Sequence, residues 1–193
     1  MSFIYKDEYK TSFTSIKLIL TDACNLNCVY CYANKNPNYM TMDTAIKSVD
    51  MLINNLKLNN QKKGSITFFG GEPMMMWDKL IVPVVEYVKN TYSDFIFSYS
   101  MTTNGTLLSK ERIDYMKNNH FSTMISLDGE EWVQDLNRPQ KNGKGSFNLI
   151  EPNLKYFIDA FPNQTMRATI SHNSIDEIFN TYQFSKSLGF KSL

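Results

Sequence analysis

The chain has 193 residues, with 20 Lys and Arg against 19 Asp and Glu, which gives a formal net charge of +1. This balance supplies no electrostatic reason to expect nucleic acid or a membrane surface as the main partner. No apolar run approaches the roughly 18 residues of a membrane span, and the first residues lack the basic start and apolar centre of a signal peptide. We therefore expect a globular protein in the cytoplasm, where thiols stay reduced and free for metal.

Strands and helices are expected to alternate along the chain. Residues 1–15 are a polar and aromatic lead-in, after which short apolar runs predict strands and apolar residues at helical spacing predict helices. The expected strands cover residues 16–20, 65–69, 95–101, 121–127 and 165–170, and residues 190–193 look like the start of a sixth. The first three expected helices cover residues 44–58 with Asp43 as cap, about 80–88 with Pro83 near the start, and 109–119 with Ser109 as cap. Ser146 opens a fourth helix, which is interrupted or bent near Pro152. A fifth helix is expected between a capping box at Ser174 to Glu177 and a C-cap at Gly189.

This alternation predicts an α/β fold built from right-handed βαβ units around a parallel sheet. A closed eight-unit barrel needs about 250 residues. The chain therefore supports a partial barrel or an open doubly wound sheet, and alternation alone does not separate the two. Residues 130–145, between the fourth expected strand and the next helix, are expected to form a polar loop.

Polar side chains with chemical potential follow four of the expected strands. Cys24, Glu72, Asn104 and Ser126 each come just after the carboxyl end of a strand. In parallel α/β architectures this edge of the sheet is where ligands bind. We therefore expect the four strand ends to converge on one site.

All three cysteines of the chain lie within residues 24–31. Thiols this close either bind a metal or form a local disulfide that leaves one thiol over. A four-iron cluster normally takes four cysteines, so three would leave one iron open to a small molecule with amine and carboxylate groups. A structural zinc site needs a fourth protein ligand, for which His172 is a better candidate than His120. The residues alone leave cluster and zinc as alternatives.

Two motifs together resemble the radical SAM superfamily. One is Cys24-x-x-x-Cys28-x-Tyr30-Cys31 after the first strand, and the other is Gly70-Gly71-Glu72-Pro73 after the second. The resemblance runs from about Ser15 to the end, and within the superfamily it is strongest to anaerobic sulfatase-maturating enzymes and peptide maturases with a C-terminal SPASM domain. Further segments that fit this branch are Asn104-Gly105-Thr106, Ser126-Leu127-Asp128-Gly129 and Arg138 ahead of Gly143-Lys144-Gly145-Ser146-Phe147.

The resemblance implies two cofactors and a reaction type. Cys24, Cys28 and Cys31 would hold a [4Fe-4S] cluster, and S-adenosyl-L-methionine would chelate the fourth iron. Reductive cleavage would give methionine and a 5′-deoxyadenosyl radical that abstracts hydrogen from a peptide or protein substrate, for thioether crosslinking or formylglycine-type maturation. The electron would come from a donor such as a flavodoxin or ferredoxin.

The resemblance also assigns roles around the cofactor. Gly70 and Gly71 lack a Cβ, so a ligand can approach the backbone closely. Glu72 is an anion suited to the ammonium of the methionyl group, although a solvated glutamate after a glycine turn is the simpler interpretation of the motif taken alone.

The other expected cofactor-binding residues each have a structural alternative. Tyr30 would face the adenine or pack under the cysteine loop, and Asn104 would contact the cofactor or only stabilise the turn before Gly105. Ser126 would bond the ribose or the carboxylate. Arg138 would pair with that carboxylate, or remain a charge facing solvent.

The chain departs from the family pattern at its end. The maturases continue through a sixth unit into a cysteine-rich SPASM domain, so we expect residues 16–193 to form a radical SAM core that is a C-terminally incomplete, partial TIM-like (β/α)6 barrel ending at about the sixth strand. Its last strand would be an exposed edge that dimerisation or a partner subunit covers. The alternative function is a truncated, non-catalytic iron–sulfur or zinc module that acts with a partner.

Overall fold

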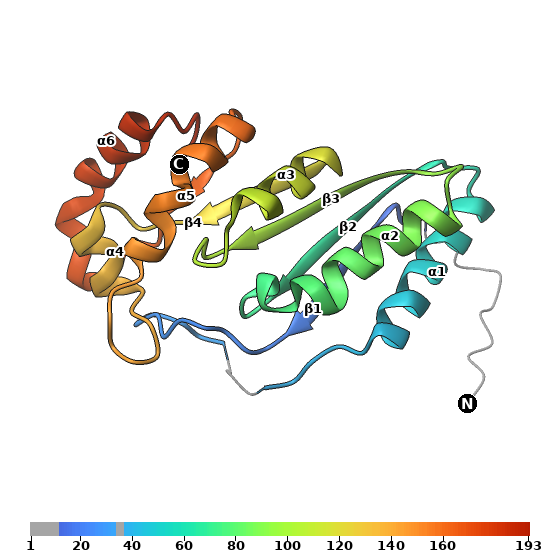
Figure 1. Ribbon diagram of the computed structural model, residues 1–193, viewed down its shortest axis with the longest axis horizontal. Coiled ribbons are helices and arrows are strands. Elements are labelled where there is room, and N and C mark those ends of the chain that lie inside the picture. Colours follow the sequence, from blue (N-terminus) through green and yellow to red (C-terminus); the bar gives the residue numbers. More distant parts are fainter. Residues whose placement is uncertain (1–11, 34–36) are drawn as a thin grey trace.

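Five parallel strands form one open sheet in the order in which they occur in the chain (Figure 1). The computed structural model describes residues 12–33 and 37–193, so most of the expected lead-in over residues 1–15 lies outside the described residues. The strands are β1 (Ser15–Thr21), β2 (Lys63–Gly70), β3 (Ile96–Thr103), β4 (Phe121–Ser126) and β5 (Met166–Arg167). A single parallel bridge between Thr165 and Ser192 follows at the position expected for a sixth strand. The prediction of a parallel α/β sheet that does not close into a full barrel is confirmed.

Helices connect each strand to the next. They are α1 (Met42–Leu58), a 3-10 turn η1 (Pro73–Met76), a π-helical turn η2 (Trp77–Ile81), α2 (Val82–Thr91), α3 (Lys110–Asn118), α4 (Glu131–Asn137), α5 (Phe147–Ala160), a 3-10 turn η3 (His172–Glu177) and α6 (Ile178–Leu188). Among the described residues, no helix is long and apolar enough to cross a bilayer.

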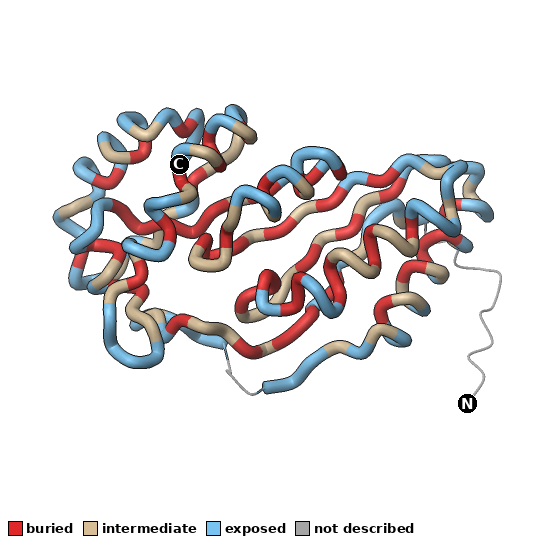
Figure 2. The backbone as a smooth tube through the Cα atoms, viewed as in Figure 1, coloured by how far each residue is buried: buried red, intermediate tan, exposed pale blue. Residues whose placement is uncertain are grey.

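The core lies on the face of the sheet that the helices cover. Alternate side chains of β1, β2 and β3 are buried, as the period of two along a strand requires (Figure 2). Phe68, Tyr99 and Phe121 stack across three neighbouring strands, with ring centroids 6.1 Å apart for Phe68 and Tyr99 and 5.2 Å apart for Tyr99 and Phe121. A slip of one residue in strand pairing would turn this aromatic row out of the core, so the row helps to fix the register that places the strand ends.

Several helix ends agree with the expectations. Ser109 caps α3 by accepting a hydrogen bond from the main-chain N–H of Arg112 at 3.3 Å. Gly189 ends α6 in the left-handed conformation, with φ of 96°. Pro83 is the second residue of α2, close to the start of that helix as expected, and Pro152 lies inside the single helix α5.

Three local expectations were wrong. Thr41, not Asp43, caps α1, because its hydroxyl accepts from the main chain of Thr44 while Asp43 already lies in the first turn. The capping box near residue 174 begins at Ser171 rather than at Ser174, and it opens η3 ahead of α6. The fifth strand is only two residues long: β5 pairs with Ile125 and Ser126 at the end of β4, and on its other side the Met166 N–H donates to Ser192 O.

The segment before Gly145 also differs from the expected polar loop. It contains α4, whose Val133 and Gln134 are buried. Gln134 satisfies both ends of its amide, with its Oε1 accepting from the Asp128 main chain and its Nε2 donating to Ser146 Oγ. A buried polar residue of this kind gives no apolar periodicity, so the helix was not visible in the sequence pattern.

Candidate cluster and cofactor site

The cysteine segment, residues 24–31, follows β1 and is pinned by its main chain to the stretch after α4. The Asn27 N–H donates to Pro139 O at 2.8 Å, and the Val29 N–H donates to Asn137 O at 2.9 Å. The Leu26 side chain is fully buried beneath the segment. In Figure 1 this blue segment reaches the orange loop beside α4. Residues that were expected to form a loop therefore hold the cysteines in place.

No disulfide joins the three cysteines, so the alternative of a local disulfide is not observed. Cys24 and Cys28 are half-buried and Cys31 is exposed, with its N–H donating to Cys28 O at 3.2 Å in a tight turn. Cys24 Sγ accepts from the Leu26 N–H at 3.4 Å and from Asn104 Nδ2 at 3.8 Å. In the part of the chain that the structure describes, no three His, Cys, Asp or Glu side chains converge as ligands of a single metal ion would.

Glu72 stands at the end of β2 and is almost completely buried, with 1% of its surface exposed. Its Oε1 accepts from Thr103 Oγ1 at 2.7 Å and from the Met74 N–H at 3.1 Å, and its Oε2 accepts from the Asn104 N–H at 2.7 Å. Burial raises the pKa of Glu72, and these three hydrogen bonds oppose the rise. An ionised carboxylate offers about four acceptor positions, so Oε2 keeps capacity for one further donor.

Gly70 and Gly71 bring the end of β2 against the backbone that follows β1. The Gly71 N–H donates to Thr21 O at 2.8 Å, and the Glu72 N–H donates to Ala23 O at 2.9 Å. A Cβ on Gly70 would collide with Thr21 O, and one on Gly71 would collide with Ala23 O. Gly70 also has φ of +150°, which favours glycine. The need for glycine here comes from contact between two backbones, in addition to any approach of a ligand.

Gly71→Ala should lower the free energy of unfolding by about 1–3 kcal/mol, because an added methyl group has no room beside Ala23 O. Denaturant unfolding of the two proteins measures the difference. Ser98→Ala, at an exposed position of β3, is the control and should change stability by less than about 0.5 kcal/mol. Equal unfolding midpoints for wild type and Gly71→Ala would show that the backbone contact is not tight.

Asn104 connects Glu72 with the cysteine segment. Its main-chain N–H donates to Glu72, while its side-chain Nδ2 donates to Asn25 Oδ1 at 2.9 Å and to Cys24 Sγ. Its Oδ1 accepts from the Thr106 N–H at 3.0 Å, which is the turn-stabilising bond expected for an Asn-Gly pair. Asn104 therefore stabilises its turn and also contacts Cys24, and its contact with the cofactor stays a prediction.

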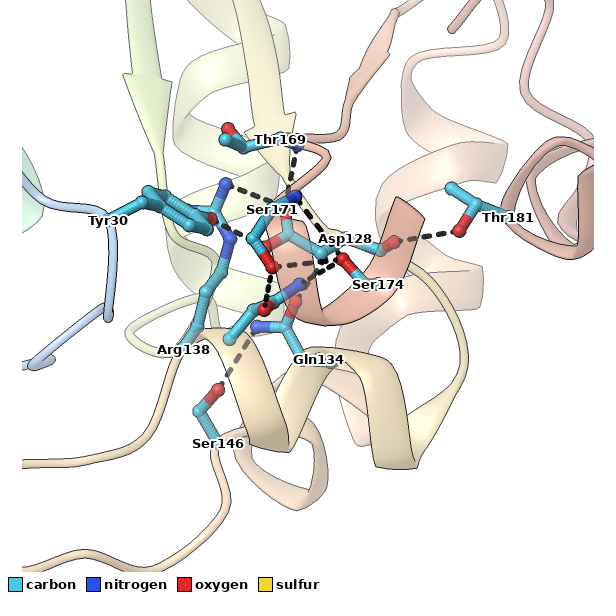
Figure 3. Close-up of polar contacts among 10 residues, drawn as sticks. Tyr30, Asp128, Gln134, Arg138, Ser146, Thr169, Ser171, Ser174 and Thr181 are labelled. Carbon is cyan, nitrogen blue, oxygen red and sulfur yellow. Dashed lines mark hydrogen bonds and ion pairs between the residues drawn. The ribbon is translucent and has the colours of Figure 1, made fainter. Parts of the chain in front are cut away.

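A second group of polar contacts is centred on Asp128, which is fully buried two residues after β4 (Figure 3). Asp128 Oδ1 accepts from Arg138 Nη2 and from the Thr169 N–H, both at 2.9 Å, and Oδ2 accepts from the Tyr30 hydroxyl. The Asp128 carbonyl oxygen accepts from Thr181 Oγ1 at 3.0 Å. The Asp128 carboxylate therefore joins the cysteine segment, the end of α4 and the segment after β5, while its main-chain carbonyl contacts α6.

Tyr30 and Arg138 are both held by this carboxylate. The Arg138 guanidinium lies 5.4 Å from the centre of the Tyr30 ring and pairs with Asp128, so it does not point to solvent. Burial lowers the pKa of Arg138, but the Asp128 carboxylate more than offsets this and raises the pKa overall. Burial also raises the pKa of Tyr30, so its hydroxyl stays protonated and donates. Arg138 Nε is buried and has no hydrogen-bond partner among the described residues.

The structure thus brings most of the expected residues together at one edge of the sheet. The cysteine segment contacts both groups, through Cys24 and Asn104 on one side and through Tyr30 and Asp128 on the other. Ser126 is buried at the end of β4, in register with Arg167 of β5. Residues that sequence reasoning did not single out are Asn25, Thr103 and Gln134. Thr103 is the last residue of β3, and its position directly before Asn104 was the one available signal for it.

Solved structures of anSMEcpe share this fold. A histidine-tagged form with bound AdoMet has a TM-score of 0.77 at 22% identity, covering 92% of this chain and 51% of that chain. A native form with bound AdoMet and Cp18Cys peptide has a TM-score of 0.75 at 24% identity, covering 93% of this chain and 48% of that chain. Together with the open parallel sheet, these similarities establish the partial TIM-like barrel.

Curated relatives match over the same region. An uncharacterized protein of Methanocaldococcus jannaschii is 42% identical over 67% of this chain and 43% of that protein. A cysteine-type anaerobic sulfatase-maturating enzyme of Clostridium novyi is 32% identical over 88% of this chain and 47% of the enzyme. The radical SAM cyclopropyl synthase TigE of Paramaledivibacter caminithermalis is 28% identical over 89% of this chain and 40% of that protein. The chain spans less than half the length of each.

The family assignment rests on most of the chain. The model of the radical SAM superfamily matches residues 18–185, a range that contains the second half of β1, the three cysteines and the Glu72 segment. Three thiols within eight residues of the chain, a buried carboxylate with spare acceptor capacity and a buried guanidinium N–H that has no partner among the described residues form a donor set that suits an iron–sulfur cluster and an amino-acid ligand. The chain belongs to the radical SAM superfamily, whose cofactors are a [4Fe-4S] cluster and S-adenosylmethionine.

Proposed function

We propose that this chain is the core of a radical SAM enzyme that modifies a peptide or protein. The observation that carries the proposal is the connection, through Asn104, between the cysteine segment and Glu72 at neighbouring strand ends. Thiols and a buried anion that are held by the same residue are expected where one ligand must meet both an iron and a carboxylate.

Each group of residues has a defined task in this proposal. Cys24, Cys28 and Cys31 bind three irons as thiolates, Glu72 accepts from the ammonium of S-adenosylmethionine, and Arg138 Nε donates to its carboxylate. When bound, the two cofactors supply reductive cleavage of S-adenosylmethionine and a 5′-deoxyadenosyl radical for hydrogen abstraction. The protein keeps the ligand in place and the site dry.

Tyr30 and Ser126 complete the proposed ligand site. The Tyr30 hydroxyl donates to Asp128, and its ring or main chain is proposed to face the adenine of the ligand. Ser126, at the end of β4, is placed for a ribose or carboxylate oxygen. Gly70 and Gly71 allow the strand end that carries Glu72 to lie close to the cysteine segment.

The substrate class rests on the relatives. Sulfatase-maturating enzymes and a cyclopropyl synthase occur among them, so cores of this kind serve more than one reaction, and formylglycine-type oxidation and thioether crosslinking are both proposed. A peptide or protein is therefore the proposed substrate, and a flavodoxin or ferredoxin is the proposed electron donor. Residues 16–193 are proposed to be one radical SAM domain.

Anaerobic reconstitution with iron and sulfide tests the proposal directly. We expect about four irons per chain, and 5′-deoxyadenosine and methionine on reduction in the presence of S-adenosylmethionine. Metal analysis of protein purified without oxygen belongs to the same experiment. Stoichiometric zinc without iron would support the non-catalytic module instead, and a cluster-loaded protein that forms no 5′-deoxyadenosine would refute the enzymatic proposal.

Glu72→Gln should weaken S-adenosylmethionine binding by roughly 10- to 100-fold, because a charge-assisted hydrogen bond contributes about 1.5–3 kcal/mol. The substitution keeps the size of the side chain and its acceptor for Thr103. Equilibrium binding to the cluster-loaded protein measures the change. Glu86→Gln is the control, because Glu86 is on α2 and bonds Tyr115 and Lys89 instead.

Binding should also depend on pH through Glu72. Its pKa is raised by burial, and only the ionised form attracts the ammonium, so affinity should fall as the pH drops through this raised pKa. In Glu72→Gln this dependence should disappear. An unchanged affinity and an unchanged pH profile in the variant would contradict the role given to Glu72.

A further inference from the structure

Two N–H groups point at the sulfur of Cys24. One is the Leu26 main chain, at 3.4 Å, and any residue at position 26 other than proline would supply it. The other is Asn104 Nδ2, at 3.8 Å, which comes from the end of β3, 80 residues along the chain. A side-chain donor brought to a cysteine from another strand is a specific feature of this sequence.

A closed ring of hydrogen bonds fixes the orientation of the Asn104 amide. Asn104 Oδ1 accepts from Thr106 Oγ1 at 2.7 Å and from the Thr106 N–H. Thr106 Oγ1 in turn accepts from Asn25 Nδ2 at 2.7 Å, and Asn25 Oδ1 accepts from Asn104 Nδ2 at 2.9 Å. Since the main-chain N–H of Thr106 can only donate, the Asn104 atom that faces it must be the acceptor Oδ1. The group that faces Cys24 is therefore an N–H and not a carbonyl oxygen.

The Asn104 amide is also protected from water. Asn104 is 6% exposed, and its main chain is tied to the buried Glu72 by the 2.7 Å bond to Oε2. Both anchors hold the side chain against Cys24 without a contribution from the cofactor. A donor that is fixed in advance in a buried place interacts more strongly with a charge than a mobile one in water does.

We propose that Asn104 tunes the reduction potential of the cluster by donating to the Cys24 thiolate. This inference rests on the proposed function, in which Cys24 is a cluster ligand. One electron from the reductase enters the cluster, and no bond forms or breaks in that step. The added negative charge spreads onto the thiolates, so an N–H at Cys24 stabilises the reduced form more than the oxidised form and raises the potential.

A redox titration of the cluster, followed by electron paramagnetic resonance without S-adenosylmethionine, tests this. Asn104→Leu removes the donor at nearly constant volume and keeps the main-chain bond to Glu72. We expect the oxidised form to become favoured about tenfold, which for one electron is a fall of about 59 mV in the midpoint. Asn119→Leu, which removes an equally buried amide at the opposite edge of the sheet, should leave the midpoint unchanged.

Thr106 provides a second, milder variant. Thr106→Val removes the hydroxyl that orients the amide and should shift the midpoint in the same direction by less, while Thr106→Ser should restore the wild-type value. Wild-type midpoints in Asn104→Leu and Thr106→Val at full iron content would overturn the inference. If the Asn104→Leu protein does not hold four irons, the midpoint potential of Thr106→Val alone decides whether the inference stands. A wild-type protein that takes up no cluster would instead refute the proposed function.

Discussion

Cys28→Ala is expected to abolish both the assembly of a complete cluster and the formation of 5′-deoxyadenosine. Cys28 is in the middle of the cysteine segment, and in the proposed function its thiolate binds one of the three irons that the protein holds. Apart from Cys24 and Cys31, which bind the other two irons in this proposal, the chain has no cysteine that could replace it. Loss of one of the three thiolate ligands leaves a second iron without a protein ligand. Because the cluster is held in the protein by these thiolates, it should not assemble completely. Iron and sulfide analysis and product assay after anaerobic reconstitution measure the two losses.

Val29→Ala is a matched control for Cys28→Ala. Val29 is the next residue, its side chain is 55% exposed, and its main-chain bond to Asn137 O does not depend on the side chain. It should therefore load iron and form product as the wild type does. A Cys28→Ala protein that still binds four irons and cleaves S-adenosylmethionine would remove the cysteine segment from the mechanism.

The fold could be predicted because its determinants are local. The apolar runs of β1 to β4 and the helical spacing of α1 are visible within windows of a few residues, and the boundaries agree closely with the structure. One error in a helix boundary arose where two neighbouring residues could both serve as the N-cap. Thr41 and Asp43 are both good N-caps two positions apart, and only the backbone decides which one precedes the first turn.

The candidate site could be predicted as a set of residue types but not as a set of partners. Cys24, Glu72 and Asn104 were expected near one another because each follows a strand end, and the structure places them in contact. Arg138 was expected at a ligand or in solvent, and its pairing with Asp128 was not foreseen, because that contact exists only once α4 has formed. Because Gln134 and Asn137 are among the buried residues of α4, the sequence has no apolar periodicity that would have predicted this helix.

Asp128→Ala should cost about 3–5 kcal/mol of unfolding free energy, the largest loss we expect from a single side chain outside the hydrophobic core. Asp128 is fully buried, and Arg138 is only 7% exposed. Removal of the Asp128 carboxylate therefore leaves a buried Arg138 cation without its partner. The Tyr30 hydroxyl and the Thr169 N–H lose their acceptor as well. Denaturant unfolding, with Asp159→Ala in the exposed Lys155 pair as control, should show a loss several times larger for Asp128.

A double-mutant cycle separates the ion pair from the rest of this loss. Arg138→Met removes the cation and keeps much of the volume, so Asp128→Ala combined with Arg138→Met should be more stable than Asp128→Ala alone. Tyr30→Phe removes only one hydrogen bond and should cost about 0.5–1.5 kcal/mol. If the losses from Asp128→Ala and Arg138→Met simply added, the two residues would not act as a pair. Tyr30 lies between Cys28 and Cys31 and donates to Asp128. A strong coupling energy between Tyr30→Phe and Asp128→Ala would therefore mean that the contacts that stabilise the Asp128 group also position the cysteines.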